Sequence, residues 1–308
     1  MKKILVIGSI NVDLVFNTEH LPLKGETLFA KHFETHFGGK GANQAFTAGR
    51  LGADVELMGV VGDDDYGRTS KHNLQHNGHV AVDRIAMTDK FTTGIANIVV
   101  AKNGDNHIIV NSGANFHFEP DYIDTIKTVI DEKEIIIFQL EIPLEVVETL
   151  AKYAKDNGKT VILNPAPGAK LSDELLQNTD YLVPNETELA ILSGLPTNTP
   201  EKAIAAAKML QKAHKIPALI VTLGEHGSYF VKADEALHIP IHKVNAVDTT
   251  CAGDSYIGAF AYMLAKGAPT REALQFAAKV SALVVTKKGA QSSVPTLSEV
   301  EAYFSETE

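Results

Sequence analysis

Short runs of β-branched and other apolar residues alternate along the chain with segments whose apolar residues recur with a helical period. The apolar runs predict buried strands over 3–10, 55–61, 135–140, 160–163, 181–183 and 219–223. The helical periods fall at 42–51, 66–77, 122–130, 144–157 and 200–214, and then at 256–266, 271–286 and 298–304. Buried strands that alternate with helices predict an α/β fold, a doubly wound and mostly parallel sheet flanked by helices on both faces.

Two segments outside this rhythm predict a second, smaller sheet. Residues 96–110 form two alternating stretches joined at Asn103-Gly104, a dipeptide that supplies the positive φ angles of a tight hairpin turn. Residues 27–36 also alternate, with apolar side chains set among polar ones. We therefore expect a single domain over 1–308, in which residues 12–36 and 91–112 form a small antiparallel β-sheet lid over one end of the main sheet.

Composition narrows the choice of partners. The 308 residues carry 28 Lys and Arg against 38 Asp and Glu, a formal net charge of -10. Such a surface repels phosphate backbones and anionic lipids, so we expect neither nucleic acid nor a membrane as the main partner. The single cysteine, Cys251, excludes a disulfide framework and cysteine-based zinc or iron–sulfur sites, and it predicts a cytoplasmic location.

A glycine-rich stretch, Gly38-Gly39-Lys40-Gly41-Ala42-Asn43-Gln44, opens the first predicted helix. Free amides and the positive end of the helix dipole can face an anion or a sugar hydroxyl there. The stretch is not a P-loop, because Lys40 precedes Gly41 rather than Ser or Thr. It is not a dinucleotide fingerprint either, because Gln44 stands at the last glycine position. A flexible helix entry without a ligand explains it equally well.

The stretch Asp248-Thr249-Thr250-Cys251-Ala252-Gly253-Asp254 leads into the predicted helix 256–266 and is more specific. Its small residues allow the amides of Ala252 and Gly253 to converge at a helix N-terminus, which suits the charge on a transferring phosphoryl group. Asp254 lies beside them, where it can accept a proton from an attacking hydroxyl, and we expect the helix dipole to keep it ionised. The alternative is that Asp254 only caps the helix.

Polar residues also follow several predicted strands. Asn11 and Asp13 end the first strand and Glu141 ends the third, and in an open parallel sheet such positions line the ligand crevice. Asn185 with Glu188 has the spacing of a capping box, and the same pair can lie near a phosphate and a hydrated Mg²⁺. The turn 222–227 is typical of an ordinary hairpin and does not by itself indicate a nucleotide.

These motifs occur together over nearly the whole chain. In order, they are Asn11-Val12-Asp13, the glycine run through Asn43, Asn164-Pro165-Ala166-Pro167, Pro184-Asn185-Glu186-Thr187-Glu188, Thr222-Leu223-Gly224 with Gly227, residues 248–254, and Lys288-Gly289-Ala290-Gln291-Ser292-Ser293-Val294-Pro295. In this combination the sequence resembles the ribokinase family of carbohydrate kinases. The motif at Asp254 and the last motif are the most specific.

The resemblance implies ATP-dependent phosphorylation of D-ribose at O5, with Asp254 as the catalytic base and the Ala252 and Gly253 amides as an anion hole. The implied sugar site comprises Asn11, Val12, Asp13, Gly39, Lys40, Gly41, Ala42, Asn43, Glu141 and Asp254. The implied ATP site comprises Asn185, Thr222, Leu223, Gly224, Glu225, His226, Gly227 and Gly253. An activating K⁺ would bind oxygens of Asp248, Thr250, Val284, Lys287, Gly289 and Ser293, and Mg²⁺ would lie near Glu188 through water. The resemblance also implies a homodimer formed through the lid.

Other functions, of the same class and of another class, stay open. A kinase whose acceptor is another sugar, such as 2-deoxyribose or fructose, or a nucleoside would share this chemistry. The polar set at Asn11, Asp13 and Asn43 favours a free sugar over a nucleoside. A non-catalytic sugar or nucleotide sensor would lack the base or the anion hole, and Ala252-Gly253-Asp254 retains both.

Overall fold

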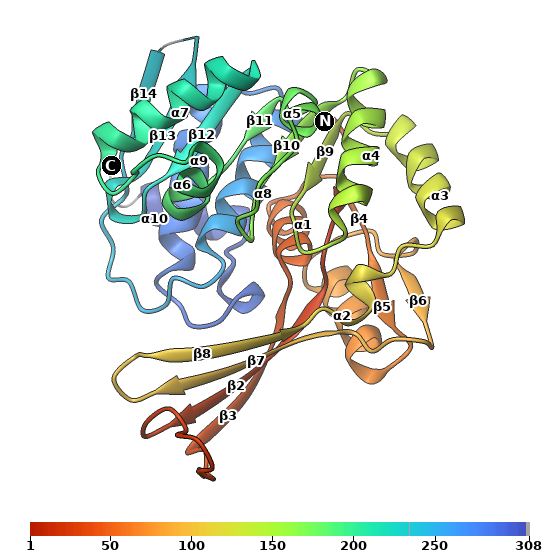
Figure 1. The fold of residues 1–308 in the computed structure, drawn as a ribbon, viewed down its shortest axis with the longest axis vertical. Coiled ribbons are helices and arrows are strands. Elements are labelled where there is room, and N and C mark those ends of the chain that lie inside the picture. Colours follow the sequence, from red (N-terminus) through yellow and green to blue (C-terminus); the bar gives the residue numbers. More distant parts are fainter. Residues whose placement is uncertain (234, 306–308) are drawn as a thin grey trace.

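The computed structural model describes residues 1–233 and 235–305, and its body is built on an eight-stranded sheet (Figure 1). The strand order is β14-β13-β12-β11-β10-β9-β1-β4. The strands are β1 (Ile4–Ile7), β4 (Val55–Met58), β9 (Ile135–Phe138), β10 (Thr160–Leu163), β11 (Tyr181–Leu182), β12 (Ala218–Thr222), β13 (Ser228–Lys232) and β14 (Glu235–Ile239). The pairings from β4 to β12 are parallel, and β12–β13 and β13–β14 are antiparallel. The predicted mostly parallel sheet is confirmed.

Helices cover this sheet on both faces, because its strands are apolar on both faces. Along β1, Ile4 and Val6 belong to one buried core, and Leu5 and Ile7 to the other. The first core includes side chains of α1 (Lys40–Arg50), α2 (Asp65–His76), α8 (Ala252–Ala265), α9 (Thr270–Val284) and α10 (Leu297–Ser305). The second includes side chains of α3 (Pro120–Asp131), α4 (Leu144–Asp156), α5 (Asp173–Gln177), α6 (Glu186–Ser193) and α7 (Pro200–His214). None of the helices in the described residues is long and apolar enough to cross a membrane.

A second sheet, of four strands, projects from one end of the body (Figure 1). Its order is β3 (His32–Gly38), β2 (Asn11–Thr18), β7 (Gly94–Ala101) and β8 (Asn106–Asn111). The β2–β3 and β7–β8 pairs are antiparallel, whereas the central β2–β7 pair is parallel. The turn between β7 and β8 contains Gly104 with a φ of 91°, as the Asn103-Gly104 dipeptide predicts. The sheet coincides with the two segments predicted as a lid.

Three predicted strands differ most from their bounds in the structure. The strand expected over 3–10 ends at Ile7, and Asn11 begins β2 of the second sheet. The strand expected over 55–61 is divided at Gly59 into β4 and β5 (Val60–Gly62), which pairs with β6 (Ala86–Thr88). Only glycine fits there, since a Cβ on Gly59 would lie 2.5 Å from the Gly8 carbonyl oxygen. The strand expected from 27 begins at His32, because its partner β2 ends at Thr18.

Candidate active site

A cavity of about 210 Å³ lies where the carboxyl ends of the central strands meet the N-termini of α1 and α8. Thr222 ends β12, Asn164 follows β10, and Val183 follows β11. The cavity is lined by Lys40, Asn164, Ala166, Val183, Asn185, Glu188, Thr222, Thr249, Cys251, Ala252, Gly253, Asp254 and Ile257. The topology therefore brings predicted catalytic, sugar and nucleotide residues to one place.

Asp254 lies in the first turn of α8 and is only 9% exposed. Its Oδ2 accepts a hydrogen bond from Asn43 Nδ2 at 3.0 Å, and its Oδ1 accepts one from Gln44 Nε2 at 2.9 Å. The N-cap position of α8 belongs to Cys251, which has a φ of 67°, and no side chain caps the helix. The interpretation of Asp254 as a helix cap is therefore wrong, because its carboxylate is directed to α1.

Burial dominates the electrostatics of Asp254. It raises the pKa of this carboxyl, and the charge of Lys40 and the amide donors of Asn43 and Gln44 oppose the rise. Asp254 in turn raises the pKa of Lys40, with Glu141 as a further contributor. Burial therefore outweighs the groups that favour the ionised form of Asp254, and its pKa lies above the usual value. A carboxylate whose pKa is raised is a stronger base and is better suited to accept a proton.

The two amides predicted to form an anion hole are not equivalent. The Ala252 amide donates to the Thr249 carbonyl oxygen at 3.2 Å, so the prediction for this amide is corrected. The Gly253 amide has no acceptor among the described residues. A Cβ built on Gly253 meets no heavy atom within 4 Å. Open space beside a free amide at a helix N-terminus suits an anionic group.

Part of the predicted sugar site gathers around Asp254. Burial, followed by the charge of Glu141, raises the pKa of Asp13 to about 6. The charge of Asp254 adds to this rise, and the charge of Lys40 opposes it. Glu141 Oε2 accepts a hydrogen bond from the Lys40 amide at 3.1 Å. Asn43 contacts Asp254 directly. These residues from β2, α1 and α8 therefore form one polar cluster with the carboxylate that follows β9.

The glycines of the predicted sugar site allow the start of α1 to lie close to the backbone of residues 8–11, beside this cluster. Gly39 has a φ of 90°, and a Cβ there would lie 2.7 Å from the Asn11 amide nitrogen. A Cβ on Gly41 would lie 2.7 Å from the Gly8 backbone, so the chain approaches α1 too closely for a larger residue. Of the predicted sugar residues, Lys40 and Asp254 line the cavity and the others do not; among the others, Val12 and Ala42 are buried apolar side chains.

The Asn185–Glu188 capping box is confirmed. Asn185 Oδ1 accepts the Glu188 amide at 2.8 Å, and Glu188 Oε2 accepts the Asn185 amide at 2.8 Å. Burial raises the pKa of Glu188, and the charge of Lys40 opposes the rise. Both capping residues line the cavity, so the motif that starts α6 also fixes two polar side chains at the edge of the site.

Of the predicted nucleotide turn, Thr222 lines the cavity. The next residues form a 3-10 helix (Gly224–His226) outside the set of lining residues. The Leu223 side chain is buried, and its amide donates to the Gly227 carbonyl oxygen at 2.8 Å. Glu225 and His226 are exposed. Thr222 therefore lines the cavity, and residues 223–227 of the turn follow it in the chain without lining the cavity.

The predicted potassium ligands lie on two adjoining segments. Asp248 Oδ2 accepts the Gly289 amide at 3.0 Å, and Asp248 Oδ1 accepts the Thr250 amide at 2.9 Å. Burial alone would raise the pKa of Asp248, but hydrogen bonds from Gly289 and Thr250 outweigh burial and lower it. The remaining predicted ligands are Val284, Lys287 and Ser293. Val284 ends α9, and the Lys287 amide donates to the Val284 carbonyl oxygen. A charged carboxylate and backbone carbonyl oxygens are ligands of the kind that a hard cation takes.

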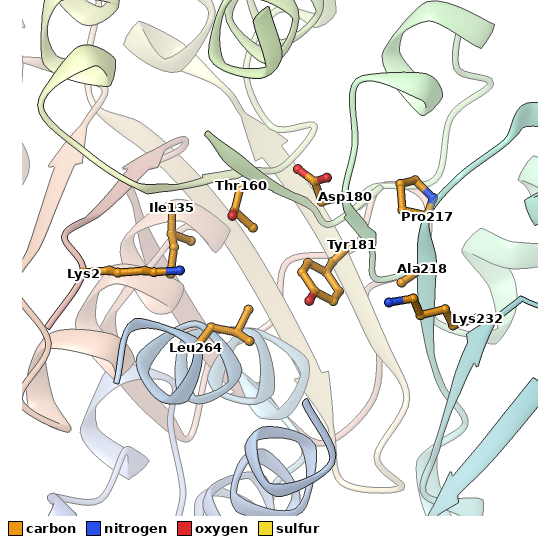
Figure 2. A pocket seen from close by; sticks show the side chains of 9 residues that line it. All are labelled: Lys2, Ile135, Thr160, Asp180, Tyr181, Pro217, Ala218, Lys232 and Leu264. Carbon is orange, nitrogen blue, oxygen red and sulfur yellow. The ribbon is translucent and has the colours of Figure 1, made fainter. Parts of the chain in front are cut away.

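A separate cavity, of about 260 Å³, lies at the amino ends of the strands (Figure 2). Ile135, Thr160 and Ala218 begin their strands there, and Lys2 and Lys232 enter from opposite sides. It shares no residue with the site around Asp254. Parallel α/β sheets bind their ligands at the carboxyl edge, so the cavity at Asp254 is the candidate active site.

Several residues of the site received no role in the sequence analysis. Ser9 Oγ donates to Glu141 Oε2 at 2.5 Å, and Asn115 Nδ2 donates to Asn11 Oδ1 at 2.7 Å. Gln44 of α1 contacts Asp254, and Gln139 and Asn164 contact Gln44 from the strand ends. Gln139 and Asn164 lie at the carboxyl ends of predicted strands, which is the signal that could have revealed them.

Residues 1–297 match the pfkB family of carbohydrate kinases, and the chain belongs to this family. It is a sugar kinase. Within the family it is 42% identical to the ribokinase of Schizosaccharomyces pombe, over 99% of this chain and 98% of the relative. It is 38% identical to the deoxyribokinase of Salmonella typhimurium, over 98% of both chains. It is also similar to the structure of Arabidopsis thaliana ribokinase complexed with ribose and ATP, with a TM-score of 0.91 and 33% identity over 98% of both chains.

Proposed function

We propose that the protein transfers the γ-phosphoryl group of ATP to O5 of D-ribose and forms D-ribose 5-phosphate. The observation that carries the proposal is that the Asp254 carboxylate and the free Gly253 amide line one cavity. Similarity to ribokinases over the full chain supports ribose as the acceptor and ATP as the donor.

In the proposed reaction, the sugar O5 attacks the γ-phosphorus, its proton passes to Asp254, and ADP leaves. Each Asp254 oxygen accepts one amide hydrogen bond, so the carboxylate retains lone pairs for the proton. The Gly253 amide lies where it can stabilise negative charge on the transferring group. Asn185, Thr222 and the turn that follows Thr222 would hold the nucleotide.

The sugar hydroxyls would bind Asn11, Asp13, Asn43 and Glu141, with Lys40 as the cation of the set. Carboxylates and amides that are fixed by their own hydrogen bonds select a polyhydroxylated ligand, because an absent hydroxyl leaves a buried polar group unpaired. A 2-deoxyribose kinase is the second candidate, since the deoxyribokinase relative is nearly as similar as the ribokinases.

Two cations fit the residues present. The charged Asp248 carboxylate and the carbonyl oxygens beside it would hold K⁺, which would add positive charge next to the anion site. Glu188 already accepts the amide and side-chain nitrogens of Asn185, so it would meet Mg²⁺ through water. Mg²⁺ bound to the phosphates neutralises charge that develops in phosphoryl transfer.

We infer that the second sheet acts as a lid and that a second copy of the chain packs on it. Its outer strand β8 is exposed along its whole length, with Ile108, Ile109 and Val110 each more than half exposed. Closing a lid over the bound sugar would exclude water from the transferring phosphate. The cytoplasmic location expected from the single cysteine stays a prediction.

The substrate proposal is tested by measuring ATP-dependent ADP release with D-ribose, 2-deoxyribose, D-fructose and a nucleoside, each with and without K⁺. We expect the highest kcat/KM for D-ribose with K⁺, and 5-phosphate as the product. A higher kcat/KM for 2-deoxyribose or fructose would overturn the assignment of the acceptor and leave the kinase chemistry intact.

The chemistry is tested separately with Asp254→Asn on the preferred sugar. We expect turnover to fall about a thousandfold, because the substitution removes the base. Two effects on folding oppose each other, since the side chain keeps its size and loses the unfavourable burial of a charge, but its new NH2 group faces one of the two amide donors. Turnover close to that of the unaltered protein would refute the role of Asp254.

A further inference from the structure

Two chains of side-chain amides end on the two oxygens of Asp254. In the longer chain, Asn77 Nδ2 donates to Asn73 Oδ1 at 2.9 Å, and Asn73 Nδ2 donates to Gln291 Oε1 at 2.7 Å. Gln291 Nε2 then donates to Asn43 Oδ1 at 3.2 Å. Asn43 Nδ2 donates to Asp254 Oδ2 at 3.0 Å. Four amides from α2, the 3-10 helix Gln291–Ser293 and α1 thus lead from the C-terminus of α2 to the carboxylate.

The shorter chain reaches the other oxygen. Gln139 Nε2 donates to Gln44 Oε1 at 2.6 Å, and Gln44 Nε2 donates to Asp254 Oδ1 at 2.9 Å. Gln44 Nε2 also donates to Asn164 Oδ1 at 3.2 Å, so both N–H groups of its amide are used. Gln44 and Gln139 are completely buried.

Both chains have the same direction. We call the amide one step further from Asp254 in a chain the outer neighbour. Each amide that has an outer neighbour accepts a hydrogen bond from it through the side-chain oxygen. The nitrogen of the same amide donates to the next group toward Asp254. A primary amide can turn either its oxygen or its nitrogen to a given side, and the outer neighbour decides which. Hydrogen bonds aligned in one direction also polarise one another.

Gln139 provides the strongest indication that the arrangement serves Asp254. Its Oε1 is buried without a hydrogen-bond partner in the part of the chain that the structure describes. A buried polar atom without a partner costs about 1–3 kcal/mol, and this cost is borne at Gln139 while the Gln44 oxygen receives its donor. The one hydrogen bond that the structure gives the Gln139 side chain goes to Gln44. That bond holds the Gln44 nitrogen toward the carboxylate.

We propose that Gln139 and Asn73 are positioning residues that fix the orientation of Gln44 and, through Gln291, of Asn43, so that N–H groups meet both oxygens of Asp254. The inference rests on the proposed role of Asp254 as the base. Gln139 is completely buried and is separated from Asp254 by Gln44, and Asn73 is separated from it by Gln291 and Asn43, so neither is expected to touch substrate. Without them, the inner amides lose the donors to their oxygens and are held only on the nitrogen side, so their N–H groups stabilise the charged form of Asp254 and orient its lone pairs less firmly.

The pH dependence of turnover reports on this arrangement. Hydrogen bonds to the charged form lower the pKa of a carboxyl, so their loss raises the pKa and moves the acidic limb of kcat to higher pH. Other charged or titratable groups also face Asp254, and they are unchanged in the variants below: Lys40 from α1, Glu141 after β9, Glu188 from α6, Asp13 from β2 and the neighbouring Cys251.

The test uses Gln139→Leu and Asn73→Leu, one variant for each chain. The matched control is Gln211→Leu, since Gln211 is a buried glutamine whose Nε2 donates to the Pro217 and Val231 carbonyl oxygens, away from the site. We expect each test variant to lower kcat about tenfold and to move the acidic limb up by about one pH unit, with the KM values for sugar and ATP within about twofold. Gln211→Leu should lower Tm without moving either quantity.

Two results would overturn the inference. One is an unmoved acidic limb and an unchanged kcat in both test variants. The other is an equal fall of kcat in Gln211→Leu, which would mark a general loss of stability. Asp254→Asn separates the two proposals: if it is inactive while the test variants behave as the control does, only the positioning role fails. If it remains active, the base assignment itself fails.

Discussion

Replacing Gly253 by alanine separates the anion site from the stability of the fold. Gly253 is the second residue of α8, it lines the cavity, and a Cβ built on it meets no heavy atom within 4 Å. Its φ is not in the positive range that favours glycine. The new methyl group would therefore fit the folded chain without displacing any atom, and it would project into open space beside the Gly253 amide.

The two expected effects have opposite signs. Alanine loses less conformational entropy than glycine on folding, so Gly253→Ala should stabilise the protein by about 0.5–1 kcal/mol and raise Tm by about 1–2 °C. The methyl group would keep the transferring phosphate away from the amide. Loss of one such donor lowers kcat by roughly 100- to 1000-fold, and we expect a fall of about a hundredfold.

Thermal unfolding and ADP release on the preferred sugar measure the two effects. Gly39→Ala is the contrasting variant, because Gly39 has a φ of 90° and its Cβ would lie 2.7 Å from the Asn11 amide nitrogen. That variant should lose stability and activity together. Gly253→Ala with undiminished turnover would show that the phosphoryl group does not approach this amide, and the reasoning about the anion site would be refuted.

Two further predictions concern the dimer and Asp13. Ile109→Lys on the exposed β8 should convert a dimer into a monomer in analytical ultracentrifugation, and a wild-type monomer or an unaffected dimer would contradict the proposed interface. Folding raises the pKa of Asp13 from its usual 3.8 to about 6, so ionisation of this carboxyl destabilises the folded protein by up to about 3 kcal/mol. This cost is absent below pH 3.8 and reaches its full size above about pH 6. Asp13→Asn should therefore stabilise the protein at pH 7.5, and the gain should be about half as large at pH 5. An equal gain at both pH values in denaturant titrations would exclude ionisation as its cause.

The local sequence predicted most elements of the body, because their signals are local. Apolar runs such as 160–163 and 135–140 are buried on both sides by helices, and they occupy neighbouring parallel strands. The spacing of Asn185 and Glu188 predicted the capping box that starts α6. Sequence alone placed Asp254 before a helix. It could not show that α8 begins at Ala252, or that the Asp254 carboxylate accepts a hydrogen bond from α1 and does not cap α8.

The sequence by itself determined the α/β class, the hairpin at Asn103-Gly104 and the residues able to carry phosphoryl-transfer chemistry, since periodicity, turn propensity and side-chain type belong to short segments. Only the tertiary structure decided how these residues meet. Asn43 and Asp254 are 211 positions apart, and Gln291 and Asn43 are 248 apart. Those distant contacts decide which backbone amide is free, whether a side-chain amide turns its nitrogen or its oxygen toward Asp254, and how strongly burial acts on a carboxyl. Hydrogen-bond geometry and desolvation arise only when the elements pack together.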